Sequence, residues 1–343
     1  MDPLTIGLVG YGFGGRYFHA PLISSAVECE FVGVVTTSPE RRALIGDEHP
    51  GLATFDTLEA IAAAGAQAVA ISTPADTHSR LTDEAIGLGL SVVCDKPFAL
   101  DPDAARHSVA LAAAAGVVLT PYQNRRWDSE FLTVRGLVAD GTLGDVRRFE
   151  SRFERHAPQN GPGAAGGGTL LDFGAHLVDQ ALLLLGPVET VYAELRVRET
   201  GLDDDVFIAL THADGVRSHL WGSWAQQAPG PRYRVTGTQA AVVITTTDSQ
   251  EDVLITGASP ADVDPWGVEP ASDLDRVHDG ASSRPIALAR GEWDTFYPAF
   301  ARAVRGEGPP PVDAADAVAT AIVLEAARVS ATTGEIVRPE VAS

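Results

Sequence analysis

The sequence is poor in cysteine and has no long apolar run. It contains only two cysteines, Cys29 and Cys94, each inside an apolar stretch, where a cysteine usually serves as a small buried hydrophobe. We therefore expect no disulfide and no cysteine-bound metal, which fits a reducing compartment. Purely apolar runs such as residues 181–185 are far shorter than the ~20 residues that a bilayer requires, so we expect no membrane association.

Clustered basic charge is also lacking. The formal net charge is −21 at pH 7, and basic residues cluster only in short pairs such as Arg125-Arg126. A chain of this charge repels the phosphates of nucleic acids and anionic lipids, so we expect neither as a partner. No basic region leads into a signal-peptide core after the first methionine. We therefore expect a cytoplasmic protein.

The length of 343 residues predicts two domains, because single cores stop growing at roughly 250 residues. Residues 1–121 alternate short β-branched runs with alanine-rich stretches, which predicts βαβ units of a parallel sheet. The expected strands are 5–10, 31–36, 68–72, 91–94 and 117–120, and the expected helices are 16–25, 40–46, 58–64, 78–88 and 102–115. Right-handed crossovers would wind them into a doubly wound α/β Rossmann domain.

Residues 122–343 follow a different pattern, which predicts an α+β domain for substrate binding and oligomerisation. Strands in succession with hairpin signals indicate a large, mostly antiparallel sheet with one face against helices. The expected strands are 145–155, 189–198, 206–212, 216–224, 232–238 and 240–246, and the expected helices are 130–139, 169–185, 293–304 and 314–330. We expect residues 161–168 to form a loop, residues 248–290 to be irregular, and the last helix to be able to pack back on the first domain.

The segment Gly10-Tyr11-Gly12-Phe13-Gly14-Gly15 matches G-x-G-x-x-G directly after an apolar strand and before a helix. The first glycine permits the tight turn, the second lets the backbone approach a pyrophosphate, and the third allows close helix packing. The helix that follows adds backbone N–H groups for the phosphates. The alternative is an ordinary glycine loop, but the surrounding βα units favour a dinucleotide site, which Phe13 would also border.

The end of the second strand indicates which dinucleotide is bound. It reads Thr36-Thr37-Ser38 with Arg41 and Arg42 close behind, and it lacks the carboxylate that would contact a free ribose 2′-hydroxyl. Hydroxyls and a guanidinium would hold a 2′-phosphate, so the pattern favours NADP, with NAD as the alternative. The two arginines are otherwise solvated residues in the first turn of a helix.

Polar residues also follow the third and fourth expected strands, at the carboxyl edge where open α/β sheets bind ligands. They are Ser72-Thr73-Pro74 with His78, and Asp95-Lys96-Pro97. In the second domain, Asp172 and His176 are four residues apart on a predicted helix and therefore share one face. Taken singly, three of these residues have a structural explanation. Lys96 could be a solvated surface lysine, Asp172 a helix cap, and His176 a buried histidine whose hydrogen bonds are satisfied.

In this order, these residues resemble the Gfo/Idh/MocA family, which includes inositol dehydrogenases and glucose-fructose oxidoreductase. Asp95-Lys96-Pro97 stands where the family usually has Glu-Lys-Pro, and residues 122–128, 172–180 and 231–233 are most similar to the NADP-dependent scyllo-inositol dehydrogenase branch. Two features depart from the family pattern. Residues 159–168 lack the Trp-Arg pair of many relatives, and Thr37-Ser38 replaces a serine-arginine pair, so a guanidinium contact must come from Arg41 or Arg42.

The resemblance implies that Lys96 lies near the nicotinamide, with Asp172 and His176 reaching in from the second domain. The family's base is assigned to either the lysine or the histidine; we expect a Lys96–His176 relay, with Asp172 orienting substrate hydroxyls. A histidine has the pKa range to take a hydroxyl proton, and a lysine can stabilise developing alkoxide charge. Asn124, Arg125 and Trp127 are expected near the substrate or nicotinamide, or else in a structural domain crossing.

The sequence therefore predicts an NAD(P)-dependent oxidoreductase that acts on a CH–OH carbon of a cyclitol, sugar or related polyol. The alternatives are a sugar or ketone reductase of the same fold, or a cofactor-binding regulator without turnover. We expect no metal, because the acidic triplet at residues 203–205 and the scattered histidines lack a ligand set and the triplet is typical of a solvated loop. A homodimer or homotetramer is expected.

Overall fold

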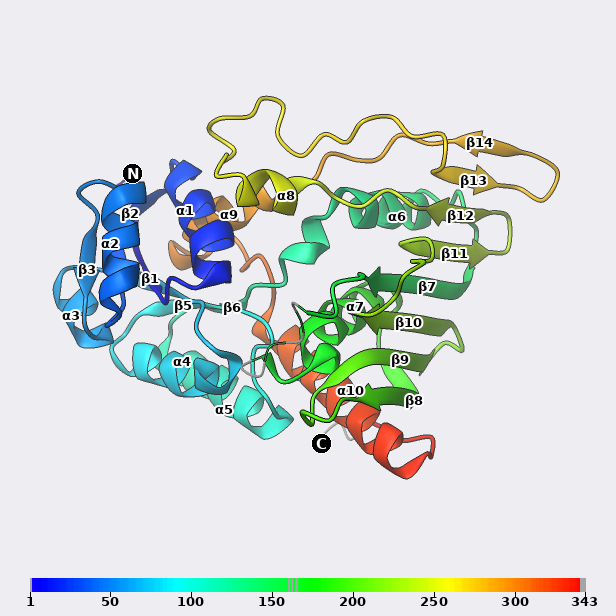
Figure 1. The fold of residues 1–343 in the computed structure, drawn as a ribbon, viewed down its shortest axis with the longest axis horizontal. Coiled ribbons are helices and arrows are strands. Elements are labelled where there is room, and N and C mark those ends of the chain that lie inside the picture. The colour runs from blue at the N-terminus through cyan, green and yellow to red at the C-terminus, as the bar shows by residue number, and fades with distance from the viewer. Residues whose placement is uncertain (1, 160, 162, 164–165, 340–343) are drawn as a thin grey trace.

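The first domain is built on a parallel six-stranded sheet in the order β3-β2-β1-β4-β5-β6 (Figure 1). The computed structural model describes residues 2–159, 161, 163 and 166–339. The strands are β1 (Leu4–Val9), β2 (Cys29–Val35), β3 (Ala53–Phe55), β4 (Ala68–Ile71), β5 (Ser91–Cys94) and β6 (Leu119–Pro121). The order turns back between β1 and β4, which is the switch point where such sheets bind nucleotides. The predicted Rossmann architecture is confirmed.

Five helices connect these strands and cover both faces of the sheet. They are α1 (Ala20–Ser25), α2 (Pro39–Glu48), α3 (Leu58–Ala63), α4 (His78–Gly87) and α5 (Pro102–Ala115). The chain enters α1 through a π-helical turn, Gly15–His19. The short strand β3 was not expected from the sequence, since it holds only three residues and none is buried.

The second domain contains an eight-stranded sheet in the order β14-β13-β12-β11-β7-β10-β9-β8. All neighbours pair antiparallel except β7 with β10, which run parallel. The strands are β7 (Val146–Glu154), β8 (Val188–Val197), β9 (Asp203–His212), β10 (Arg217–Ser223), β11 (Tyr233–Gly237), β12 (Ala241–Ile244), β13 (Arg276–His278) and β14 (Ser283–Pro285). The mostly antiparallel sheet that the sequence predicts is therefore confirmed.

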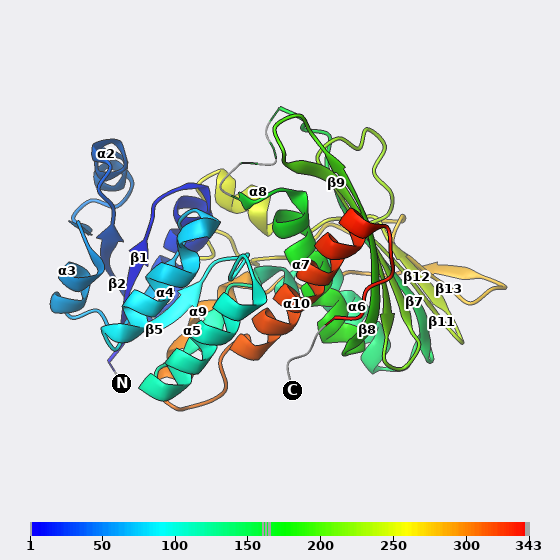
Figure 2. The same cartoon turned by 90° about the horizontal axis from the view of Figure 1, so that it is seen from below.

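Helices cover one face of this large sheet and separate it from the first domain. Figure 2 shows α7 (Thr169–Leu185) and α10 (Ala314–Thr333) between the two sheets. Helix α7 packs on β7, β9 and β10, and α10 packs on β8. Helix α6 (Ser129–Ala139) adds Phe131 and Val134 to the same core. Along β9, every second residue is buried from Val206 to His212, as expected for a strand with one covered face.

The C-terminal segment returns to the first domain. Helix α9 (Phe296–Val304) buries Phe296, Tyr297 and Phe300 in one apolar cluster with β1, β2 and β4. The N-terminal half of α10 packs into the apolar cluster on the opposite face of the six-stranded sheet. The C-terminal half of α10 packs into the core of the eight-stranded sheet. The Rossmann sheet is thus covered partly by the last fifty residues of the chain.

Two sequence expectations are wrong. The segment 248–290, expected to be irregular, contains α8 (Gln250–Ile255) as well as β13 and β14. The acidic triplet at 203–205 begins β9 and is not a solvated loop. Asp203 Oδ2 accepts the Leu170 N–H at 2.6 Å and so caps α7, and Asp204 pairs with two arginines of β8 and its turn.

Other expectations fall partly outside the described residues. Of the predicted loop 161–168, positions 162, 164 and 165 are among the undescribed residues.

Cys29 and Cys94 both carry free thiols. Over the part of the chain that the structure describes, no helix combines the length and apolar character needed to cross a membrane.

Candidate functional site

The glycine-rich turn after β1 packs closely against the ends of β4 and β5. Gly10 has a φ of +94°, and a methyl group there would lie 2.4 Å from the Ser72 carbonyl oxygen. A methyl group on Gly14 would lie 2.9 Å from Asp95 Oδ2, and one on Gly15 would lie 2.4 Å from the Gly10 carbonyl. Each of these positions therefore accepts only glycine without rearrangement.

The same turn is open at Gly12. The nearest atom to a methyl group placed there is a guanidinium nitrogen of Arg41, 4.0 Å away, so the backbone borders free space of the kind that a pyrophosphate needs. Phe13 beside it is 57% exposed, which leaves its ring available to a ligand. The residues present therefore fit a dinucleotide.

Arg41 and Arg42, which follow the end of β2, have different contacts. Arg42 donates to the Thr36 carbonyl at 2.7 Å and pairs with Asp56 at 2.7 Å, so it stabilises the strand end. Ser38 caps α2 by accepting the Arg41 N–H at 3.2 Å, and Thr37 is exposed. Among the described residues, the Arg41 guanidinium makes no hydrogen bond or ion pair, which leaves it available beside Gly12.

His78 holds together two loops at the carboxyl edge of the sheet. Its Nδ1 lies 2.8 Å from the Pro97 carbonyl and its Nε2 lies 2.9 Å from the Thr73 carbonyl. Only a doubly protonated ring can donate to both oxygens. Burial lowers the pKa of His78, but the Cys94 sulfur, Asp95 and the Pro97 carbonyl outweigh burial and raise it to about 9. Pro74, between these loops, begins a short 3-10 turn at Ala75–Thr77.

Asp95 is anchored beneath the glycine-rich turn. Its carboxylate accepts Ser72 Oγ at 2.9 Å and the Lys96 N–H at 2.9 Å, and it lies 3.5 Å from His19 Nε2. Burial alone would raise the pKa of Asp95, but contacts with His19, His78 and Lys96 lower it below its usual range. His19, which the sequence left unassigned, is fully buried, with its Nδ1 2.5 Å from the Tyr297 hydroxyl.

Lys96, the only lysine in the chain, bridges the two domains. Its Nζ forms an ion pair with Asp172 Oδ1 and lies 3.4 Å from the Asp172 carbonyl oxygen. Asp172 is in the first turn of α7 but does not cap it, since Asp203 supplies that contact. The carboxylate is therefore directed at Lys96 and away from its own helix end.

His176 lies one turn further along α7 and is 4% exposed. Its Nδ1 is buried and has no hydrogen-bond partner among the described residues. Burial, reinforced by the positive charges of Lys96 and Arg125, lowers the pKa of His176 well below its usual value. The lowered pKa favours the neutral form of the ring at physiological pH.

A cavity of about 260 Å³ lies between the domains and brings many of the predicted site residues together. Its lining includes Phe13, Gly14, Asp95, Lys96, Asn124, Arg125, Asp172 and His176. Trp127 is not part of this lining; its ring packs against Phe296 with centroids 5.6 Å apart. Arg125 is held by ion pairs to Asp128 and Glu251, so its guanidinium is a fixed part of the wall.

The sequence analysis missed the aromatic and charged wall opposite Lys96. Phe173 stacks between Phe153 and Trp224 with ring centroids 4.2 and 4.7 Å apart. Arg155 and Glu251 complete this wall. These residues come from β7, α7, the end of β10 and α8, and no local motif connects them.

No metal-binding cluster accompanies the cavity. In residues 2–159, 161, 163 and 166–339, no group of three or more histidine, cysteine or acidic side chains is placed to hold a metal ion. The functional groups available for chemistry are therefore one ammonium, one neutral imidazole and several carboxylates and guanidiniums.

A glycine-rich turn at the switch point of a parallel sheet, with an ammonium and an imidazole across an interdomain cavity, defines a dinucleotide-dependent oxidoreductase. Sequence comparison gives the particular family. The model of the "Oxidoreductase family, NAD-binding Rossmann fold" matches residues 4–123, and the "GFO/IDH/MocA C-terminal domain" matches residues 131–243. The chain belongs to the Gfo/Idh/MocA family of oxidoreductases.

Individual relatives match over nearly the whole chain. The Escherichia coli oxidoreductase YdgJ is 33% identical over 332 residues, covering 94% of this chain and 95% of that protein. The scyllo-inositol 2-dehydrogenase (NADP(+)) IolW of Bacillus subtilis is 29% identical over 339 residues, covering 95% and 93%. The crystal structure of an oxidoreductase from Bacillus cereus superposes with a TM-score of 0.88 at 25% identity, covering 99% of each chain.

Proposed function

We propose that this oxidoreductase uses NADP to interconvert a CH–OH group and a carbonyl on a cyclitol, sugar or related polyol. One observation carries the proposal: Lys96, Asp172 and His176 line one small polar cavity next to the open side of the glycine-rich turn. The relative named as an NADP(+) scyllo-inositol 2-dehydrogenase supports this substrate class.

The three side chains have different roles near the substrate oxygen. A bound nicotinamide supplies the acceptor for the hydride. The Lys96 ammonium donates a hydrogen bond to the substrate hydroxyl oxygen and stabilises the negative charge that develops there. His176, which lines the cavity and is held neutral by its lowered pKa, accepts the hydroxyl proton and returns it when the reaction runs as a reduction.

Asp172 positions Lys96 and does not itself take the proton. Its ion pair with Nζ fixes the ammonium at the cavity wall, and its second carboxylate oxygen is left for neighbouring substrate hydroxyls. A vicinal diol can donate one hydroxyl to this oxygen while the other lies between Lys96 and His176. This arrangement favours polyols over simple alcohols.

Arg41 supports the choice of NADP over NAD. It is the arginine near Gly12 that makes no other contact among the described residues, and no carboxylate ends β2. A guanidinium at this place can pair with a ribose 2′-phosphate.

Steady-state turnover tests the proposal. The purified chain is incubated with NADP and with NAD against a panel of inositols, aldoses and ketoses, and the reduced nicotinamide is followed by absorbance. We expect turnover of at least one polyol, with a higher kcat/KM for NADP. Cofactor binding without turnover of any panel member would identify a regulator and reject an enzymatic role.

A further inference from the structure

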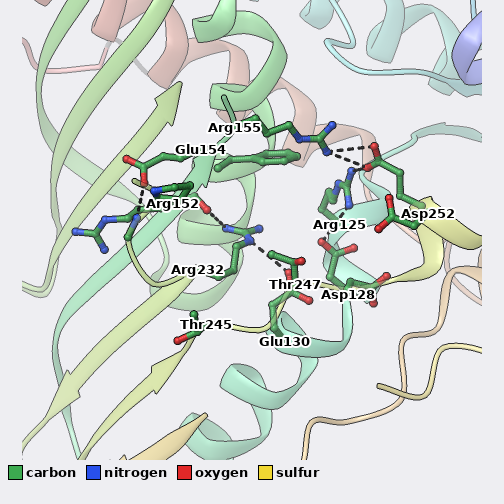
Figure 3. Close-up of a pocket in the computed structure, with 15 residues that line it drawn as sticks. Arg125, Asp128, Glu130, Arg152, Glu154, Arg155, Arg232, Thr245, Thr247 and Asp252 are labelled. Atoms are coloured by element: carbon green, nitrogen blue, oxygen red, sulfur yellow. Dashed lines mark hydrogen bonds and ion pairs between the residues drawn. The ribbon is translucent and has the colours of Figure 1, made fainter. Parts of the chain in front are cut away.

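A second cavity of about 370 Å³ adjoins the reaction cavity and is not used by the mechanism above (Figure 3). The two cavities share four lining residues: Arg125, Phe153, Arg155 and Glu251. The second cavity extends away from Lys96 toward the ends of β7 and β11 and the segment before α8.

The shared wall is a charged bridge. Arg125 and Arg155 both form ion pairs with the carboxylate of Glu251. Arg155 Nη2 lies 3.1 Å from Glu251 Oε1, and the Arg125 guanidinium is held between the rings of Phe153 and Trp293, 5.1 Å from each centroid. Burial alone would raise the pKa of Glu251, but Arg125 and Arg155 lower it to about 2, so the bridge stays ionised.

The lining of the second cavity is polar and mixed in charge. It contains four arginines and six carboxylates, and Phe153 and Pro229 supply its only apolar side chains. Sugar hydroxyls both donate and accept hydrogen bonds, so they match a wall that offers both kinds of group.

The same lining disfavours anions and aromatic groups. Burial raises the pKa of both Asp128 and Glu130, which shows that negative charge is poorly solvated there. A phosphate or carboxylate would add to this charge, and an aryl group would leave the polar wall unpaired. An uncharged polyhydroxylated group is therefore the best match.

Size points in the same direction. The reaction cavity alone is smaller than the roughly 300–1,000 Å³ typical of small-molecule sites, and the nicotinamide also has to enter it, whereas the two cavities joined fall within that range. A single ring beside Lys96 would leave the adjoining cavity to water.

We propose that the cavity beyond the Arg125–Glu251–Arg155 bridge binds a second, uncharged sugar ring, so that the substrate is a disaccharide or other glycoside. The inference rests on the proposed function and specifies its substrate. The ring to be oxidised lies beside Lys96 and His176, and the second ring receives hydrogen bonds from Arg155 across the bridge.

A blocking variant tests the second site. Thr247 is exposed, lines the second cavity and is absent from the lining of the reaction cavity, so Thr247→Trp fills the former without touching the latter. Thr200, exposed in the turn between β8 and β9 and outside both linings, provides the matched control Thr200→Trp.

The full chain with NADP is assayed against methyl glucosides, inositols, neutral glucose disaccharides, and a disaccharide whose second ring is a uronate. The added hydrogen bonds to the second ring predict at least a tenfold higher kcat/KM for one neutral disaccharide than for the single rings or the uronate. Thr247→Trp should remove this advantage and leave single-ring turnover unchanged, and Thr200→Trp should change neither.

Equal or better turnover of single rings, preference for the uronate, or an equal effect of Thr247→Trp on both substrate sizes would overturn the second-ring site while leaving the proposed function intact. Absence of turnover for every substrate would instead reject the proposed function, and the inference with it.

Discussion

The ammonium of Lys96 and the carboxylate of Asp172 form an ion pair across the two domains. Lys96 follows β5 of the first domain, and Asp172 lies on α7 of the second. The pair therefore fixes the reactive end of Lys96 only when both domains are in place, and it couples domain geometry to the chemistry proposed above.

Replacing Lys96 with methionine should lower kcat by about 10²–10⁴-fold, because the substrate oxygen loses its hydrogen-bond donor and stabilising charge. Cofactor affinity, measured by titration calorimetry, should change little, since the glycine-rich turn is untouched. A variant that keeps wild-type turnover would contradict the assignment.

Because Lys96 is the only lysine, reductive methylation with ¹³C-formaldehyde gives a single side-chain NMR signal. This signal should shift when the polyol is added to the protein with bound cofactor. The same signal should also shift in Asp172→Asn without ligand, since the ion pair is then lost. An unchanged signal in both experiments would place Lys96 away from the substrate and from Asp172.

Arg41→Ala should raise KM for NADP about tenfold or more and leave KM for NAD nearly unchanged, because a charge-assisted contact to a phosphate contributes roughly 1.5–3 kcal/mol. Arg42→Ala is the contrasting variant. Arg42 supports the carbonyl of Thr36, so its loss should weaken both cofactors alike. Equal effects of Arg41→Ala on the two cofactors would show that Arg41 does not read the 2′-phosphate.

His78 should make stability depend on pH. Its pKa is raised to about 9 in the folded chain against about 6.5 when unfolded, so its contribution is complete below about pH 6.5 and is lost as pH rises through 9. Urea unfolding should show a loss of up to about 3 kcal/mol over this interval. His78→Gln should lack this part of the slope, and an identical pH profile for the two proteins would rule out a charged His78.

Arg126, in the segment that connects the two domains, contacts both α7 and α10. It donates to Asp179 at 2.8 and 2.6 Å and pairs with Asp316 at 2.9 Å. Arg126→Met should cost about 3–5 kcal/mol of unfolding free energy, because it leaves Asp179 buried and unpaired. Arg80→Met, which removes an exposed pair with Glu84, should cost less than about 1 kcal/mol. Similar losses in both variants would refute the structural role of Arg126.

The uncovered face of the large sheet should form the contact of a homodimer or homotetramer. Phe207 and Trp221 lie on this face with ring centroids 5.2 Å apart, and Arg152 lies 3.9 Å from the centroid of Trp221. Trp221→Glu should shift the chain to a monomer in sedimentation experiments while the fold is retained. A wild-type chain that sediments as a monomer would reject this surface as an interface.

The sequence predicted most of the elements whose signal is local. The glycines after β1, the alternating units of the first domain and the spacing of Asp172 and His176 each follow from short-range patterns of packing and periodicity. The ion pair between Asp172 and Lys96 was not among the expectations, because a sequence alone cannot show which of several polar partners a side chain meets.

The missed parts depend on distant segments. The stack of Phe153, Phe173 and Trp224 and the bridge to Glu251 form only when β7, α7 and α8 meet, so none has a sequence signature. Helix α8 has just six residues, too few for a periodic pattern, and lies in a stretch rich in acidic residues and proline. The parallel pairing of β7 with β10 likewise follows from tertiary arrangement.

The return of α9 and α10 to the first sheet has a consequence for synthesis on the ribosome. The aromatic side chains of α9 and the alanines that open α10 complete the apolar layers on the two faces of a sheet whose strands are translated long before them. The nascent Rossmann domain therefore keeps apolar surface uncovered until α9 and the start of α10 have emerged from the ribosome. A chain truncated before residue 293 would therefore lose apolar cover of the nucleotide-binding half as well as its own end.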